Sequence, residues 1–196
     1  MATEKDPRAL VVVAHPNLRT RSQVNRHWVE ELERHPDEFC VRDLCAAYPT
    51  GALSREDVAA EQALLGAHDV VVLQFPLYWY SCPALLRTWM DEVLSFGWAY
   101  GGDETVAPGE PGRALAGKRL AVAVSAGDER ANYASDRPVG YALDEVLAPF
   151  WATFRYLETT YDPHAFALYG AEDDPSEAEL AQSARDYADW VRALQA

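Results

Sequence analysis

Short, continuous apolar segments recur along the chain and alternate with longer amphipathic ones. Residues 8–14 and 70–75 are runs of mainly alanine, valine and leucine that are too short to cross a membrane and lack helical spacing. Such runs are typical of strands that are buried on both faces of a parallel sheet. The pattern predicts further strands over residues 39–44, 118–125 and 165–169.

The intervening segments have the spacing of helices with one apolar face. Val24, Trp28, Val29 and Leu32 mark a helix that ends near Arg34. Further helices are expected over residues 54–66, 84–96, 141–155 and 177–194. About five alternations of strand and helix, without repeats or a boundary linker, predict a doubly wound parallel sheet. We expect one domain over residues 1–196, with a polar leader at 1–7 and the C-terminal helix at 176–196.

Composition narrows the class of function. The formal net charge of −14 argues against nucleic acid or an anionic membrane as a partner. The N-terminus lacks the apolar core of a signal peptide, and no run approaches the length of a spanning helix. Cys40, Cys45 and Cys82 have no metal-ligand spacing and form no paired framework, so we expect no metal site and a reducing, cytoplasmic location.

The loop after the first predicted strand is rich in hydrogen-bond donors and leads into a helix. Its donors are Arg19, Thr20, Arg21, Ser22 and Asn25. A helix start adds unpaired N–H groups and the favourable end of the dipole, so this loop is a candidate phosphate cradle without a Gly-rich motif. The alternative is that Ser22 simply caps the helix.

Two further loops follow strands of the same sheet. The loop after Phe75 continues with a proline and an aromatic cluster and suits a planar ring, although such clusters are more often packing surfaces, here against a neighbouring subunit. The loop after Ser125 is small and contains Gly127 and Tyr133. Because parallel strands end at one edge, the three loops must converge. Together they match the needs of flavin mononucleotide (FMN): phosphate donors, a wall for the ring and N–H groups at its pyrimidine edge.

These pieces resemble the flavodoxin-like NAD(P)H:quinone oxidoreductase family, which includes DT-diaphorase and the ancillary subunits of bacterial glutathione-gated potassium efflux systems. The resemblance implies a flavodoxin-like doubly wound five-stranded parallel sheet with helices on both faces. The matching pieces, in the family's order, are Ala14-His15-Pro16, Ser22 with Asn25, residues 74–80, residues 89–94, residues 96–101 and the strand end at Ser125.

The resemblance also implies roles for individual residues. His15, Ser22 and Asn25 would lie at the FMN phosphate, assisted by the N–H of Val24. Tyr133 would be catalytic, although the histidine of the diaphorases' Tyr/His relay has no counterpart between Tyr133 and Pro163. The ring would be lined by Pro76, Leu77, Tyr78, Trp79 and Tyr80, and its pyrimidine edge by Ser125, Ala126, Gly127 and Asp128, where Asp128 replaces a family glycine. Alternatively, His15 accepts only a backbone hydrogen bond and Tyr133 is an ordinary loop residue.

The implied activity is two-electron transfer of hydride from NAD(P)H through FMN, or alternatively FAD, to a quinone by a ping-pong mechanism. In this family the flavin lies at a homodimer interface with a shared active site, where we expect Trp98 and Tyr100 to pack. Two other functions remain open: a flavin-bound regulatory subunit of a membrane potassium-efflux transporter, and a flavin-free binding module.

Overall fold

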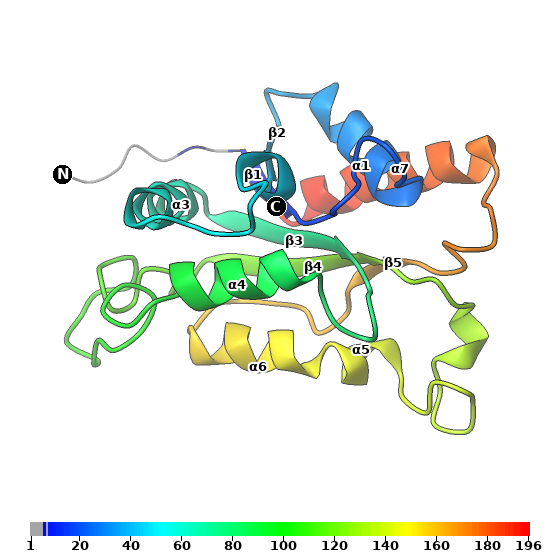
Figure 1. Ribbon diagram of the computed structural model, residues 1–196. Helices are drawn as coiled ribbons and strands as arrows, with labels where there is room; N and C mark the ends of the chain where they lie inside the picture. The colour runs from blue at the N-terminus through cyan, green and yellow to red at the C-terminus, as the bar shows by residue number, and fades with distance from the viewer. Residues whose placement is uncertain (1–5, 7) are drawn as a thin grey trace.

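The computed structural model of the chain describes residue 6 and residues 8–196, so the expected leader falls almost wholly outside the described residues. Its centre is a five-stranded sheet with the order β2-β1-β3-β4-β5, in which every neighbouring pair is parallel (Figure 1). The predicted fold class is therefore confirmed, while the single-domain prediction stays a prediction. The strands are β1 (Ala9–Val13), β2 (Phe39–Asp43), β3 (Val70–Pro76), β4 (Arg119–Ser125) and β5 (Phe166–Leu168).

Side chains of the central strands alternate between two packed layers. In β1, Leu10 and Val12 pack into one apolar cluster, whereas Val11 and Val13 pack into the other. Figure 1 shows α4 and α6 on one side of the sheet and α1 and α7 on the other. The helices of the first layer are α3 (Arg55–Ala67), α4 (Ala84–Val93) and α6 (Ala148–Tyr156), and those of the second are α1 (Val24–Glu33) and α7 (Glu177–Ala193).

Two of the long helices begin with a reciprocal capping box. The Ser54 hydroxyl accepts a hydrogen bond from the Asp57 N–H at the start of α3, and Ser176 does the same for Glu179 at the start of α7. Ser176 therefore caps α7, the helix expected at the C-terminus. These caps occupy backbone N–H groups that would otherwise be free to bind an anion.

Three predicted boundaries were wrong for local reasons. The helix expected over residues 141–155 is divided into α5 (Leu143–Val146) and α6, and Pro149 lies in the first turn of α6, a position that proline tolerates. A short helix, α2 (Leu44–Ala47), replaces part of an expected loop because the Asp43 carboxylate caps it. Helix α4 ends at Val93 instead of residue 96.

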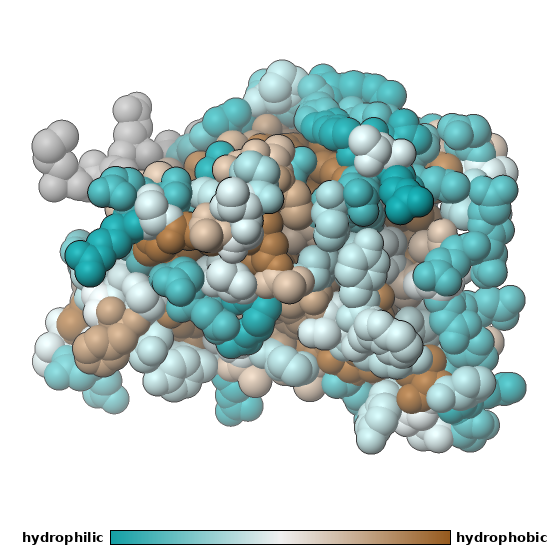
Figure 2. Space-filling model, viewed as in Figure 1, coloured by the Kyte–Doolittle hydropathy of each residue, from teal (hydrophilic) through white to brown (hydrophobic). Residues whose placement is uncertain are grey.

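One face of the molecule is largely polar (Figure 2). On the face shown in Figure 2, hydrophilic residues predominate and hydrophobic patches lie between them. Among residue 6 and residues 8–196, no helix has the length and apolar character needed to span a membrane.

Candidate functional site

The three predicted loops meet at the carboxyl edge of the sheet and line two adjoining clefts. The phosphate cleft, as we call it, has a volume of about 350 Å³ and is lined by His15, Ser22 and Asn25 among others. The ring cleft, of about 770 Å³, is lined by Tyr78 and Tyr133 among others. Both volumes lie in the range of small-molecule sites. The residues that line both clefts are Leu77, Tyr78, Gly127 and Glu172.

Helix α1 begins in the phosphate cleft without a side-chain cap. Its N-cap residue is Gln23, which makes no capping hydrogen bond with its side chain among the described residues. The alternative in which Ser22 caps the helix is therefore wrong. Ser22 and Val24 are buried and line the cleft, which leaves the first N–H groups of α1 and the positive end of its dipole facing the space between them.

The other donors of this loop divide between the cleft and the surface. Arg21 lines the phosphate cleft, so it supplies a positive charge there in a protein that is acidic overall. Arg19 instead forms an ion pair with Glu33 on the outer face of α1. Thr20 is exposed and is not among the residues that line the cleft.

His15 is held in one orientation at the end of β1. Its Nδ1 accepts a hydrogen bond of 3.1 Å from the Asn17 N–H, so the backbone bond that we considered as an alternative is present. Burial lowers the pKa of His15 below its ordinary value of 6.5, which favours the neutral ring. In that ring the proton is on Nε2, which leaves one N–H donor on a residue that also lines the cleft.

The Asn25 side chain is part of a buried hydrogen-bond network. It is therefore less available to bind a ligand than we expected from the sequence. Its side-chain amide donates to the Ser125 hydroxyl at 2.8 Å and accepts from the Gln74 amide at 3.2 Å. Gln74 also donates to the Asn25 carbonyl. The network joins the start of α1 to the ends of β3 and β4. Sequence reasoning quoted Gln74 only as part of a motif and missed this positioning role.

The aromatic loop forms a tight hairpin at the mouth of the ring cleft. The N–H groups of Tyr78 and Ser81 each donate to the other's carbonyl, and the two residues between them, Trp79 and Tyr80, have φ values of 48° and 59°. Two consecutive positive φ values at a two-residue tip are typical of a type I′ turn. Pro76 is buried at the end of β3, while Trp79 is 93% exposed. The hairpin thus projects its aromatic rings around the cleft.

Tyr133 faces the ring cleft from the loop after β4, just beyond the short helix η1 (Arg130–Asn132). Burial raises the pKa of its hydroxyl to about 12, and the neighbouring Tyr80, Asp128 and Tyr169 add to this effect. The hydroxyl therefore keeps its proton at neutral pH and is a hydrogen-bond donor.

The loop between Ser125 and Tyr133 is held by hydrogen bonds within the loop and by one to β5. The Asp128 carboxylate accepts from the Glu129 N–H at 2.8 Å and from the Asn132 amide at 2.6 Å, so the acid that replaces a family glycine is engaged within its own loop. Ala126 is fully buried, and its N–H donates to the Leu168 carbonyl.

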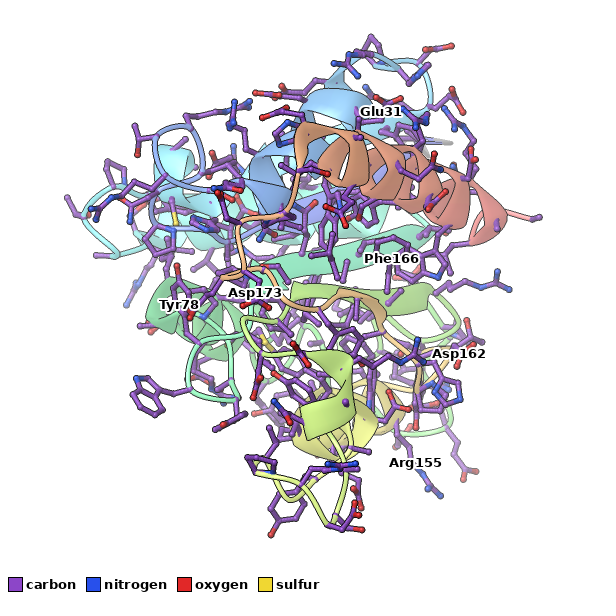
Figure 3. All side chains as sticks on the ribbon, turned by 90° about the vertical axis from the view of Figure 1, so that its right-hand side faces the viewer. Glu31, Tyr78, Arg155, Asp162, Phe166 and Asp173 are labelled. Carbon is purple, nitrogen blue, oxygen red and sulfur yellow. The ribbon has the colours of Figure 1, made fainter. Side chains whose placement is uncertain are left out.

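A fourth segment lines both clefts, and sequence reasoning missed it. It follows β5 and contributes Glu172 to both clefts, Asp174 to the phosphate cleft and Asp173 to the ring cleft. Figure 3 shows Asp173 and Tyr78 on the same side of the molecule. The segment could have been predicted from its place in the sequence, because it follows a strand of the same parallel sheet and must emerge at the same edge.

Trp98 and Tyr100, which we expected at a subunit interface, lie away from both clefts. Trp98 and Tyr100, in the loop after α4, are partly buried, and Tyr100 lines a groove between α4 and α6 together with Tyr156. Neither Trp98 nor Tyr100 is among the residues that line the two clefts.

Comparisons with known proteins agree with this architecture. Residues 7–191 match the family described as having a flavodoxin-like fold. General stress protein 14 of Bacillus subtilis is 41% identical over 183 residues, which are 93% of this chain and 96% of that protein. A protein of the same organism named as the uncharacterized NAD(P)H oxidoreductase YrkL is 38% identical over 186 residues, which are 95% of this chain and 98% of that protein. The potassium-efflux ancillary protein KefG of Salmonella paratyphi B is 35% identical over 184 residues, 94% and 92% of the two chains.

Two solved structures are also similar. General stress protein 14 of Treponema denticola, crystallised in complex with FMN, has a TM-score of 0.84 and 42% identity, and the match covers 96% of this chain and 99% of that one. The NADPH-quinone reductase of P. pentosaceus has a TM-score of 0.78 and 27% identity over 94% of this chain and 97% of that one. Since the family match and these relatives span nearly the whole sequence, the chain belongs to the flavodoxin-like family that contains general stress protein 14, YrkL and KefG.

Proposed function

We propose that this protein is an FMN-dependent NAD(P)H oxidoreductase that reduces a quinone. The observation that carries the proposal is the pair of adjoining clefts, one at the uncapped start of α1 and one lined by aromatic side chains. The likeness to an FMN complex and to proteins named NAD(P)H oxidoreductase and NADPH-quinone reductase supports it.

The residues present fit FMN. At the phosphate end, the His15 Nε2–H, the Ser22 hydroxyl and the N–H groups of Val24 and Asn25 are donors near a helix N-terminus, with Arg21 supplying positive charge. This donor set fits a phosphate monoester. We assign FMN instead of FAD because the FMN complex of general stress protein 14 shares 42% of its sequence with this chain.

At the ring end, the cleft offers flat side chains and a proton donor. Leu77, Tyr78 and Tyr80 would pack around the ring, and the N–H groups near Gly127 would face its pyrimidine edge. When bound, FMN would supply the hydride transfer between NAD(P)H and a quinone. Tyr133 would hold its proton beside the ring and donate a hydrogen bond where negative charge develops. If NAD(P)H and the quinone were to bind in turn beside the same ring, the kinetics would be ping-pong.

The activity can be tested directly. Protein equilibrated with FMN and freed of unbound flavin should remain yellow and oxidise NADH or NADPH faster when a benzoquinone is present. Double-reciprocal plots at several quinone concentrations should be parallel. Converging lines would reject the ping-pong mechanism, and colourless protein without turnover would reject the enzyme.

We further propose that the active protein is a homodimer. Phe96 is 75% and Tyr156 is 68% exposed, and both contact Tyr100 beside the groove between α4 and α6. Large exposed aromatic side chains in one region favour an interface with another chain. That the two subunits share an active site is a proposal that rests on the family resemblance alone.

A second candidate function is that of an ancillary subunit for a membrane potassium-efflux system, which the likeness to KefG favours. Such a subunit would retain its flavin but associate stably with the transporter. Co-purification with a transporter encoded by the same genome, together with flavin that NAD(P)H bleaches but that shows no turnover when a quinone is added, would favour this second function over the first.

A further inference from the structure

Glu172 occupies the junction between the two clefts. Among the described residues that line both clefts, it alone has a charged side chain. Its carboxylate packs directly over Gly127, where a Cβ would lie only 3.0 Å from the Glu172 Oε1. Gly127 therefore leaves the space that the carboxylate uses.

The backbone holds this glutamate in place. Beyond the paired strands β4 and β5, the Gly170 N–H donates to the Asp128 carbonyl and the Ala171 N–H donates to the Ala126 carbonyl, both at 2.9 Å. The Glu172 N–H makes a longer contact of 3.5 Å with the Gly127 carbonyl. The position of Glu172 thus follows from the sheet register and does not depend on a free loop.

The Glu172 carboxylate has no hydrogen-bond or ion-pair partner among the described residues. Glu172 forms no hydrogen bond or ion pair through its side chain with any residue that the structure describes, whereas the nearby Asp174 accepts a hydrogen bond from Gln23. At the same junction, the Tyr78 carbonyl already accepts a hydrogen bond from the Ser81 N–H, and no other described residue that lines both clefts has a carboxylate. Glu172 is therefore the strongest available acceptor between the two clefts.

From this placement we infer that Glu172 binds the ribityl chain of the flavin by accepting hydrogen bonds from its secondary hydroxyls. The inference rests on the proposed function. With the phosphate at the start of α1 and the ring among the tyrosines, the polyol that joins them must cross the junction. Polyol hydroxyls are donors, and an ionised carboxylate is an acceptor without a proton of its own.

The test compares the binding of three flavins, from which the phosphate and then the ribityl chain are removed in turn. FMN has phosphate, ribityl chain and ring, riboflavin lacks the phosphate, and lumiflavin lacks both the phosphate and the ribityl chain. We expect Glu172→Ala to weaken FMN and riboflavin by roughly tenfold each and to leave lumiflavin within about twofold, as measured by fluorescence titration. Glu172→Gln, which keeps a neutral acceptor, should lie between the wild type and Glu172→Ala.

Glu129→Gln is the matched control because Glu129 is exposed, lies nearby and is not among the residues that line either cleft. It should leave all three affinities unchanged. The inference would be overturned if Glu172→Ala weakened lumiflavin as much as FMN, or if it changed the affinity for none of the three flavins. It would also be overturned if Glu172→Gln bound FMN more tightly than the wild type and riboflavin equally well, because the carboxylate would then be a repulsive neighbour of the phosphate. A wild-type protein that binds none of the three flavins would instead overturn the proposed function itself, and the inference with it.

Discussion

At the scale of single residues, Ser22 and Asn25 differ in a way that the sequence could not reveal. The Ser22 hydroxyl makes no hydrogen bond within the part of the chain that the structure describes, whereas the Asn25 amide joins Ser125 and Gln74. A ligand role and a positioning role can therefore be separated by experiment.

We predict that Ser22→Ala weakens FMN binding by roughly 1 to 3 kcal/mol but leaves the unfolding free energy of the flavin-free protein unchanged within about 0.5 kcal/mol. Asn25→Ala should lower that unfolding free energy by roughly 1 to 3 kcal/mol because it leaves buried partners unpaired. Urea denaturation and flavin titration measure the two quantities. Equal stability losses in both variants would contradict the division of roles.

Tyr133 is predicted to act through its protonated hydroxyl. Tyr133→Phe should slow one half-reaction, reduction by NAD(P)H or reoxidation by quinone, by about tenfold, or about 1.4 kcal/mol, in stopped-flow measurements. Tyr141→Phe, which removes an exposed hydroxyl outside both clefts and outside the proposed interface, should change neither half-reaction. If Tyr133→Phe also leaves both unchanged, Tyr133 is only a loop residue.

His15 should make stability depend on pH in a defined direction. Its pKa is lowered by burial, so as the pH falls below about 6.5 the unfolded chain takes up a proton before the folded one does. The contribution of the neutral ring to stability is therefore present above that pH and is lost as the pH falls toward the folded-state pKa.

His15→Asn, which keeps an acceptor for the Asn17 N–H, provides the comparison. The difference in unfolding free energy between wild type and variant, measured without flavin, should decrease between about pH 7.5 and about pH 5. A difference that grows on acidification would contradict the assignment of a lowered pKa.

The candidate residues were predictable where a loop carried distinctive side chains. The donor-rich, aromatic and Gly-containing loops all follow strands with clear apolar runs. Glu172 was missed because β5 is only three residues long and partly exposed, so the acidic segment after it looked like the solvated approach to α7. The roles of Asn25 and Gln74 depend on contacts between distant segments, which the local pattern does not contain.

At the scale of elements, a buried carboxylate holds several of them together. Glu61 of α3 is 1% exposed and accepts hydrogen bonds from Arg42 at 2.8 Å, Tyr48 at 2.6 Å and Trp89 at 3.0 Å. It thus joins α3 to β2, to the end of α2 and to α4, the helix that follows the aromatic hairpin.

We predict that Glu61→Ala lowers the unfolding free energy by about 3 kcal/mol, because three buried or half-buried donors lose their acceptor. Glu61→Gln should cost less since it keeps one acceptor oxygen. Glu56→Ala, on the exposed side of the same helix, should cost no more than about 1 kcal/mol. A loss as small for Glu61→Ala as for Glu56→Ala would mean that the network contributes little.

Element types were easier to predict than their limits. The strands buried on both faces stood out as continuous apolar runs, and Ser176 marked the start of α7. The helix over residues 141–155 failed because one continuous apolar stretch concealed a break before Pro149, and α2 failed because its existence depends on a single aspartate cap.

At the scale of the whole molecule, the alternation of strands and helices was sufficient for the fold class. The strand order was not predicted, because hydrophobic pattern alone does not say which buried strands are neighbours. The sequence also predicted a subunit interface at Trp98 and Tyr100, and that interface stays a prediction.

We predict that the protein is a homodimer at micromolar concentration and that Tyr156→Glu weakens it, because a charge would be buried among Phe96 and Tyr100. Sedimentation velocity measures the change. Glu110→Gln, in an exposed part of the loop before β4, is the control and should leave the dimer intact. A wild-type monomer that binds FMN fully would contradict the shared-pocket arrangement.

The central claim is that the two clefts hold a flavin that cycles between NAD(P)H and a quinone. The most direct measurement is the anaerobic absorbance of the FMN-loaded protein through one cycle. We predict that stoichiometric NAD(P)H bleaches the flavin absorbance and that one equivalent of a benzoquinone restores it. A protein that retains no FMN, or whose bound flavin is not bleached by either nucleotide, would contradict the account.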